Sequence, residues 1–236
     1  MPVRGQQGTT PHAGLAADRV LITRAAATDQ VADVLRARIV QGYFPPGTRL
    51  PEEVIRQALG VSRGTLRESF RLLAQERLLV HELNRGVFVS TLTVADLLDI
   101  FRVRRIVEDA ALSRLSAHSG LEAAKTALER CERHAAGGAW RAYADADADF
   151  HLALVSAAGS SRLNGLVRGV LGELQLAFPA SGDLVCLRQR QLGQNREMWR
   201  HLAAGDTGAG RKVLALSLDE YERALIDGCP AAGGTS

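Results

Sequence analysis

Three arginines recur at every fourth position of one predicted helix: Arg63, Arg67 and Arg71. At 3.6 residues per turn, this spacing places their side chains in a stripe along one side of the helix. A guanidinium group presents paired donors that match guanine O6 and N7, and it also binds phosphate. The predicted chemistry is therefore recognition of a polyanion such as DNA. The alternative is a solvated face on an ordinary surface helix.

A helix-turn-helix is predicted to position these arginines. A short helix over residues 52–59 ends at Gly60, and Ser62 is a suitable N-cap for a second helix that runs to about Glu76. The second helix gains a buried face from Leu66, Phe70 and Leu73. In this motif the N-terminal part of the second helix enters the major groove. The turn therefore favours DNA binding over a merely solvated face.

Further candidate contacts lie beside the arginines and in a predicted β-hairpin. Gly64 removes a side chain where the helix would press against the duplex, and the Thr65 hydroxyl is placed to reach a phosphate. Residues 79–83 and 86–90 are β-prone. The turn between these two runs is predicted from Asn84, Arg85 and Gly86. The hairpin tip is predicted to act as a wing that contacts the DNA backbone or the minor groove.

The composition is that of a soluble globular protein. The 236 residues are 46% hydrophobic, and neither a membrane span nor a secretory signal is visible, so we expect a cytoplasmic protein without a membrane partner. The net charge is +3, but residues 1–92 hold 12 arginines, no lysine and 8 acidic residues, which supports a polyanion partner for this part. Cys131, Cys186 and Cys229 form no C-x-x-C pair and are expected to be free thiols.

The second half is predicted to be an all-α bundle with polar side chains in its interior. Helices are expected near residues 94–117, 121–135, 139–157, 161–177, 185–204 and 208–226. Asp147 and His151 share the apolar face of the third helix, and the other polar groups on apolar faces are Arg104, Asn195 and Ser217. Their grouping predicts a polar cavity that binds a small-molecule effector. Alternatively they satisfy one another, Asp147 with His151 and Arg104 with Glu108.

The predicted fold class is mainly α. An N-terminal winged helix-turn-helix with a small β-hairpin wing is followed by an all-α helical bundle. The expected divisions are a flexible leader, a DNA-binding domain, an effector-binding and dimerisation domain, and a flexible tail. They cover residues 1–27, 28–92, 93–228 and 229–236, respectively.

Residues 31–90 resemble the winged-helix domain of GntR-type bacterial transcription regulators. The resemblance is carried by PPGTRL at 45–50, LGVSR at 59–63, LRE at 66–68 and NRGVFV at 84–89. It implies that Arg63, Gly64, Thr65 and Arg67 contact the operator, and that Asn84, Arg85 and Gly86 form the contacting part of the wing. Pro51 departs from the pattern, because relatives often have a capping serine there.

Residues 93–226 resemble the FadR-type effector domain that follows the winged helix in one GntR subfamily. The resemblance is carried by VR at 103–104 with Glu108, DADFH at 147–151, AG at 158–159 and AGD at 204–206. Many members hold a divalent metal through one Asp and three His, and the metal holds an organic-acid effector.

The metal ligands are only partly matched in this chain. Asp147 and His151 match the first two ligands, whereas Asn195 and Ser217 stand where the other two histidines are found. Amide and hydroxyl oxygens are poor ligands for zinc or nickel, so metal binding is expected to be weak or absent. The effector is then expected to bind the cavity directly.

These patterns together predict a transcription regulator, most simply a repressor. A homodimer would bind double-stranded operator DNA, and an organic-acid effector in the helical bundle would control its operator affinity. An enzyme that uses the Asp147/His151 pocket, with or without a metal, is the alternative. No nucleophile lies in a recognisable setting, so the sequence favours a protein that is not an enzyme.

Overall fold

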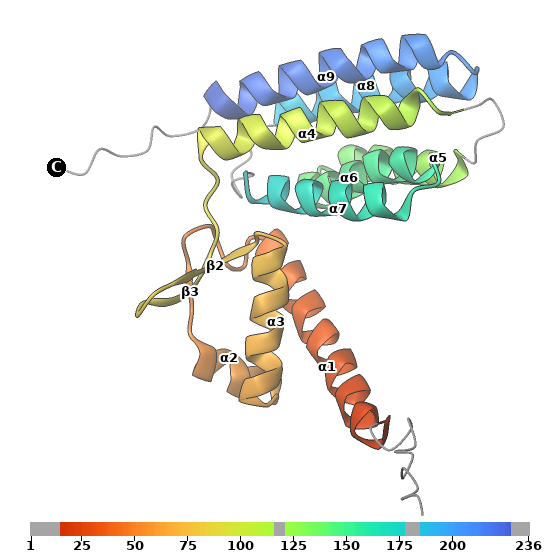
Figure 1. Cartoon of the computed structure of the whole chain (residues 1–236). Coiled ribbons are helices and arrows are strands. Elements are labelled where there is room, and N and C mark those ends of the chain that lie inside the picture. Colours follow the sequence, from red (N-terminus) through yellow and green to blue (C-terminus); the bar gives the residue numbers. More distant parts are fainter. Residues whose placement is uncertain (1–14, 116–120, 178–184, 228–236) are drawn as a thin grey trace, which may run out of the picture.

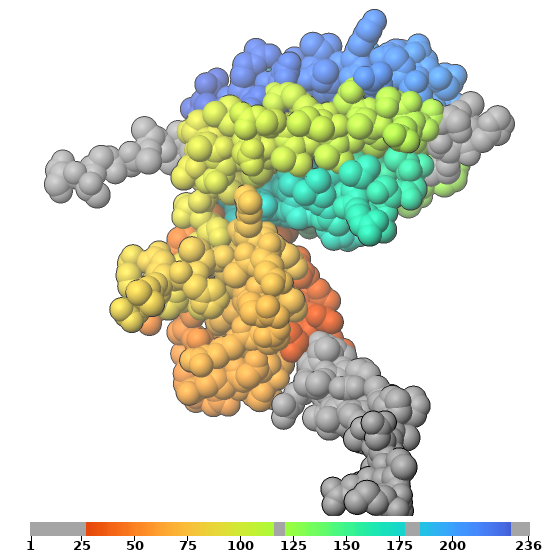
Figure 2. All heavy atoms as spheres, viewed as in Figure 1, coloured from red at the N-terminus to blue at the C-terminus, as the bar shows by residue number. Residues whose placement is uncertain are grey.

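The computed structural model describes residues 15–115, 121–177 and 185–227, and side chains from residue 27 onward. These ranges form two units, a smaller N-terminal one and a larger all-helical one (Figure 1). The space-filling view shows that the surface is hollowed where the units meet, between α7 and α1 (Figure 2). The predicted tail and Cys229 lie outside the described residues.

The helices and strands follow one another in the predicted order. The N-terminal unit contains α1 (Leu15–Val40), β1 (Arg49–Leu50), α2 (Glu52–Leu59), α3 (Arg63–Gln75), β2 (Leu79–Glu82) and β3 (Gly86–Val89). The helical unit contains α4 (Val94–Leu112), α5 (Glu122–Ala136), α6 (Trp140–Ser156), α7 (Ser161–Leu174), the 3-10 turn η1 (Gln175–Ala177), α8 (Val185–Ala203) and α9 (Thr207–Asp227). The mainly α fold with a small wing is confirmed.

The wing is a three-stranded antiparallel sheet with the order β1-β3-β2. The predicted hairpin is present, with Val80 paired to Phe88 and Glu82 paired to Gly86. β1 is an addition, and it places Arg49 opposite Phe88 on the other edge of β3. The sequence did not predict β1 because a strand of two residues shows no alternation of its own. It is defined by its pairing partner.

α1 begins at Leu15, inside the range that was expected to be a flexible leader. Residues 15–27 are rich in alanine, leucine and arginine and contain neither glycine nor proline, so nothing local stops a helix there. α1 is attached to α3 through a buried hydrogen bond in which Ser69 Oγ donates to the carbonyl oxygen of Thr28, at 2.8 Å. The first fourteen residues lie outside the described ranges.

The helical unit is organised around α4, which packs against α6, α7 and α9. A capping box fixes its start: Thr93 Oγ1 accepts from Asp96 N at 3.2 Å, and the Asp96 carboxylate accepts from Thr93 N at 2.8 Å. The core includes Phe101, Phe150 and Met198, which are fully buried. No helix within the described ranges has the length and hydropathy needed to cross a membrane.

The junction between the units runs through η1. Leu176 is buried in the core of the N-terminal unit, although it follows a helix of the other unit. Its neighbour Gln175 turns the other way, and its Nε2 donates to the carbonyl oxygen of Ala144 in α6 at 3.1 Å. Two consecutive side chains therefore pack into different units.

Candidate nucleic-acid interface and interior cavity

The turn between α2 and α3 has the geometry that the sequence predicted. Gly60 adopts the left-handed conformation (φ 65°) that ends α2. Ser62 caps α3, since its Oγ accepts from Thr65 N at 3.1 Å. Figure 1 shows that the N-terminal end of α3 lies on the side of the N-terminal unit that faces away from the helical unit. This is the end that the helix-turn-helix motif presents to DNA.

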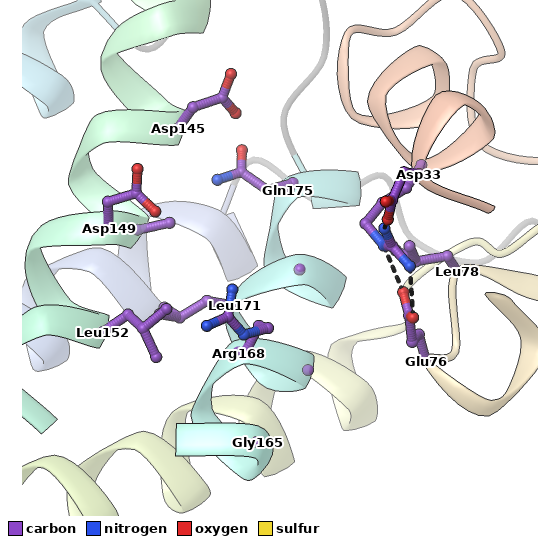
Figure 3. Close-up of a pocket in the computed structure, with 14 residues that line it drawn as sticks. Asp33, Glu76, Leu78, Asp145, Asp149, Leu152, Gly165, Arg168, Leu171 and Gln175 are labelled. Atoms are coloured by element: carbon purple, nitrogen blue, oxygen red, sulfur yellow. Dashed lines mark hydrogen bonds and ion pairs between the residues drawn. The ribbon is translucent and has the colours of Figure 1, made fainter. Parts of the chain in front are cut away.

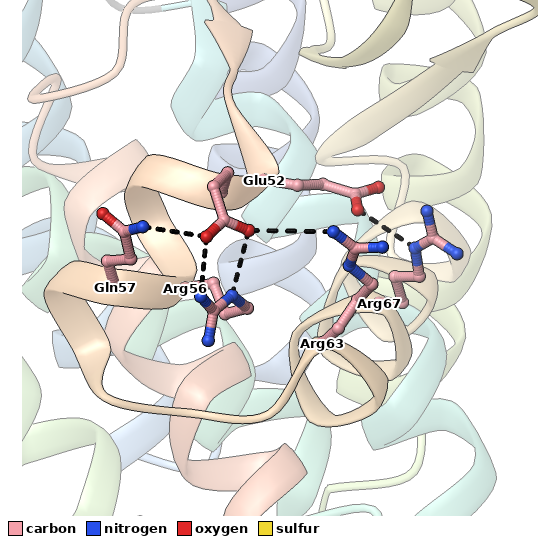
Figure 4. Close-up of polar contacts among 6 residues, drawn as sticks. Glu52, Arg56, Gln57, Arg63 and Arg67 are labelled. Carbon is pink, nitrogen blue, oxygen red and sulfur yellow. Dashed lines mark hydrogen bonds and ion pairs between the residues drawn. The ribbon is translucent and has the colours of Figure 1, made fainter.

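Arg63 and Arg67 reach into solvent from the first turns of α3, with side chains 68% and 62% exposed. Each faces an acid of α2 (Figure 4): Arg67 Nε lies 3.0 Å from Glu52 Oε2, and Arg63 Nη2 lies 3.8 Å from Glu53 Oε2. Exposed ion pairs of this kind are weak, because water and salt screen them. The two guanidinium groups can therefore exchange a carboxylate for a phosphate or a base edge.

Glu53 accepts hydrogen bonds from two side chains of α2 and also contacts Arg63, so it links α2 to α3. Hydrogen bonds from Arg56 and Gln57 lower the pKa of Glu53 to about 2 (Figure 4). Glu52 and Glu53 both stand in the first turn of α2, at the positive end of its dipole. Their contacts with the α3 arginines were missed, because they span the turn rather than one helical face.

The other predicted contacts on α3 are also at the surface. Gly64 is exposed, and the Thr65 hydroxyl lies 2.8 Å from Ser62 Oγ, within hydrogen-bond distance of the capping side chain. Arg71 is 60% exposed and pairs with Glu68, one turn earlier. The predicted stripe of arginines exists, with every member held by a carboxylate at the surface.

The wing tip carries the three predicted residues in exposed positions. Asn84 and Gly86 have positive φ, at 62° and 110°, which allows the tight turn. Arg85 is 70% exposed, contacts Glu82 and lies over the ring of Phe88. A further arginine was missed here: a Cβ added to Gly86 would lie 3.4 Å from Arg49 Nε, so β1 adds a second guanidinium group beside the tip.

The interior of the helical unit contains a series of buried polar contacts that starts with the ion pair of Arg104 and Glu108. Arg104 Nε donates to Glu108 Oε1 at 2.6 Å, and Glu108 Oε2 lies 2.7 Å from His151 Nδ1. All three side chains are at most 5% exposed. The predicted pairing of Arg104 with Glu108 is present. Asp147 and His151 do not pair: His151 meets Glu108 because α4 packs against α6, and Asp147 Oδ1 accepts from Asn195 Nδ2 at 2.6 Å.

The opposite charges of Arg104 and Glu108 stabilise each other. Burial alone would raise the pKa of Glu108, but the positive charge of Arg104 and the neighbouring His151 lower it to about 2. Burial also opposes ionisation of Arg104, and Glu108 more than compensates, so the pKa of Arg104 is raised. Glu108 is therefore an anion that holds a cation in place, and the sequence offered it only as a possible partner of Arg104.

A small polar cavity lies beside Arg104, and we call it the interior cavity. It is lined by Arg104, Tyr143, Ala144, Asp147, Ala148, Leu171, Leu174, Gln175, Arg188, Gln191 and Tyr221. Its free space is about 10 Å³, roughly that of one water molecule. Three of its buried polar atoms have no hydrogen-bond partner among the described residues: Arg104 Nη2, Tyr143 Oη and Gln175 Oε1. Leaving buried donors and acceptors without partners costs free energy, so a polar molecule in the cavity would stabilise these atoms.

Two of the predicted effector-binding residues, Asn195 and Ser217, do not line the cavity themselves. Asn195 reaches it through Asp147, and its own Oδ1 is buried without a partner. Ser217 is buried on α9 and does not line the cavity. The sequence missed the cavity residues Gln175 and Arg188, and only the burial of polar side chains on helix faces could have indicated them.

The donor set does not fit a transition metal. Of the four family positions, only Asp147 and His151 carry the expected ligand types, and each already has a hydrogen-bond partner. Within the described ranges, no group of three or more His, Cys, Asp or Glu side chains is placed to hold a metal ion. Asn195 and Ser217 offer neutral oxygens, which zinc and nickel bind poorly.

Comparison with known proteins agrees with this division into two units. Residues 27–89 match the family described as "Bacterial regulatory proteins, gntR family", and residues 99–220 match the FCD domain. A transcriptional regulator GntR from Rhodococcus sp. RHA1 is 36% identical, with a TM-score of 0.83 over 87% of this chain and 100% of that one.

Two relatives are named as operon transcriptional repressors. The "Probable D-xylose utilization operon transcriptional repressor" of Paenarthrobacter nicotinovorans is 34% identical over 145 residues, which cover 60% of this chain and 64% of that protein. The gluconate operon transcriptional repressor of Bacillus subtilis (strain 168) is 35% identical over 94 residues, covering 40% of this chain and 38% of that protein. This chain thus spans less than two thirds of the length of either repressor.

A winged helix-turn-helix followed by an all-helical domain defines a class of two-domain bacterial regulatory proteins. The matches cover both domains in the same order. The chain belongs to the GntR family and carries the FCD domain of its FadR-like subfamily.

Proposed function

We propose that this chain is a transcriptional repressor that binds operator DNA and releases it when a small organic acid occupies the interior cavity. The observation that carries the proposal is the exposed N-terminal end of α3, where Arg63 and Arg67 project beside the helix-turn-helix turn. Arginine in this position suits guanine O6 and N7. Membership of the GntR family supports the same function.

The residues proposed to contact DNA form two groups. The α3 group reads base edges and nearby phosphates, and it consists of Arg63, Gly64, Thr65, Arg67 and Arg71. The wing group holds the backbone or minor groove, and it consists of Asn84, Arg85 and Gly86, with Arg49 beside them. Since all of these lie in the N-terminal unit, the helical unit is left for sensing and assembly.

The proposed effector is a small carboxylate. Arg104 Nη2 is a buried donor without a partner, and Arg188 lines the same cavity. A carboxylate would satisfy the Arg104 donor, and it would also accept from the unpaired hydroxyl group of Tyr143. Because the present space holds about one water molecule, binding requires the cavity to expand. An occupant would therefore change how the helices around the cavity pack against one another.

The chain is proposed to act as a homodimer in the cytoplasm, and not as an enzyme. Two apolar side chains support the dimer: Ile106 on α4 and Leu166 on α7 are 65% and 48% exposed on helices that pack together. The enzyme alternative needed Asp147 and His151 as a pair, and each has another partner. A partner that is chromosomal DNA requires a cytoplasmic protein.

The effector test is a thermal-shift screen of small mono- and dicarboxylic acids, with the matching primary amides as controls. We expect one or more acids to raise the melting temperature and to weaken operator binding. Arg104→Lys keeps the charge opposite Glu108 but removes the second guanidinium nitrogen, so the shift should disappear in this variant. Equal shifts in the wild type and in Arg104→Lys would contradict the assignment, as would the absence of any response to acids.

A further inference from the structure

A second and larger cavity lies between the two units, and we call it the interdomain cleft (Figure 3). Its volume of about 590 Å³ is in the range of small-molecule sites. One wall comes from the N-terminal unit and the other from α6, α7 and η1. The lining residues that carry the argument are Asp145, Gly165, Gly169, Gly172 and Gln175.

The α7 wall of the cleft is made flat by three glycines, Gly165, Gly169 and Gly172. They recur on one face of a helix, although glycine is a poor helix former. A Cβ added to any of them would meet no atom within 4 Å among the described residues. Packing inside the described chain therefore does not require glycine here, and the flat wall leaves room for an occupant.

The lining of the cleft is acidic. It contains four carboxylates and two guanidinium groups, a formal charge of −2: Asp33, Glu76, Asp145 and Asp149 against Arg36 and Arg168. Arg36 is already held by Glu76 through two contacts of 2.7 Å. Asp145, in contrast, has no hydrogen bond or ion pair with any described residue. Asp145 is exposed at the cleft, and desolvation by its surroundings raises its pKa, an effect that the charge of nearby Arg141 offsets only in part.

Gln175 supplies an independent indication of a ligand. Its side chain is 7% exposed and extends toward Asp145 and Asp149 (Figure 3). Its Nε2 is occupied by the carbonyl oxygen of Ala144, at 3.1 Å. Its Oε1 is buried and has no partner among the described residues. An acceptor in this position needs a donor, and neither carboxylate beside it can provide one when ionised.

We propose that the interdomain cleft binds a small organic cation with a primary ammonium group. The ammonium group donates to Gln175 Oε1 and to the Asp145 carboxylate, and the aliphatic part lies on the glycine face of α7. A cation is favoured over an anion because the lining has a formal charge of −2 and the buried atom without a partner, Gln175 Oε1, is an acceptor. This site differs from the interior cavity, whose unpaired Arg104 Nη2 is a donor.

The experiment is isothermal titration of the full-length chain, without DNA, with 1,5-diaminopentane, and with 1,5-pentanediol as a neutral probe of the same length. We expect saturable binding of the diamine at one site per chain and none of the diol. Asp145→Asn should weaken diamine binding by about tenfold. Gly169→Leu, which fills the cleft and improves helix propensity, should abolish binding.

Gly193→Leu is the matched control, because Gly193 is an exposed glycine of α8 outside the cleft with equally open space. It should bind the diamine as the wild type does. The proposal is overturned if the diamine does not saturate the wild type, if the diol binds equally well, or if Asp145→Asn and Gly169→Leu bind with unchanged affinity. Operator binding does not enter these measurements, so their failure would leave the proposed repressor function standing.

Discussion

The chain uses arginine in two opposite settings, at the surface of α3 and inside the helical unit. Arg67 is 62% exposed and contacts Glu52 at 3.0 Å, whereas Arg104 is 2% exposed and contacts Glu108 at 2.6 Å. The exposed pair is screened and exchangeable, which a DNA contact needs. The buried pair is fixed, because either charge alone would be uncompensated. The same type of side chain is therefore exposed at a proposed DNA contact in one unit and is a buried, paired cation in the other.

The largest effect is expected from breaking the buried pair. Glu108→Gln leaves Arg104 without its counter-charge and should reduce the free energy of unfolding by about 3–5 kcal/mol, measured by urea denaturation. Glu53→Gln makes the same change at an exposed ion pair and should leave stability within error. Similar losses in both variants would contradict the contrast between the two settings.

Local signals predicted most of the fold. Gly60 and Ser62 act within their own turn, and the apolar spacing of α3 lies within one helix, so the sequence alone indicated a helix-turn-helix. The contacts that were missed join residues far apart in the chain. Glu108 and His151 are separated by 43 positions, and Glu52 and Arg67 by 15. Such pairs are decided by how helices pack, which periodicity does not reveal.

Acid should distinguish the two settings in a second way. The pKa of Glu108 is lowered from 4.5 to about 2, so its stabilising effect is present above pH 4.5 and is lost as the pH falls toward 2. The pKa of exposed Glu53 is lowered as well. At about 0.5 M salt the contribution of Glu53 should be screened, while that of Glu108 should persist.

Thermal unfolding of the wild type and of Glu108→Gln between pH 6 and pH 2.5 tests this expectation. These pH limits cover most of the window between the ordinary pKa of 4.5 and the folded-state pKa of Glu108, which is about 2. The wild type should lose stability more steeply than the variant, and high salt should not remove the difference. Parallel pH profiles would argue against Glu108 as the buried anion.

A smaller effect, on DNA binding alone, is expected at α3. Arg63→Ala and Arg67→Ala should each weaken specific operator binding by about 1–3 kcal/mol, measured by fluorescence anisotropy. Their stability should be unchanged, because both side chains are exposed. Arg102→Ala is the matched control, since Arg102 is 68% exposed on α4, pairs with Asp99 and lies in the other unit. An equal loss of operator affinity in all three variants would contradict the assignment of a DNA-binding role to α3.

The smallest effect should have the opposite sign. Glu52→Gln releases Arg67 from its ion pair and removes a negative charge beside the proposed phosphate contacts. Operator affinity should rise by about two- to fivefold, with the gain shrinking as salt is added. A loss of affinity would instead mean that Glu52 positions Arg67 for its DNA contact.

The most direct test of the account is selection of bound fragments from genomic DNA of the source organism by the purified full-length chain at low salt. The wild type should enrich fragments that share one two-fold-symmetric motif, and the Arg63→Ala/Arg67→Ala double variant should not. Recovery of no enriched motif by the wild type, or of the same motif by the double variant, would contradict the assignment of α3 as the part of this protein that reads DNA.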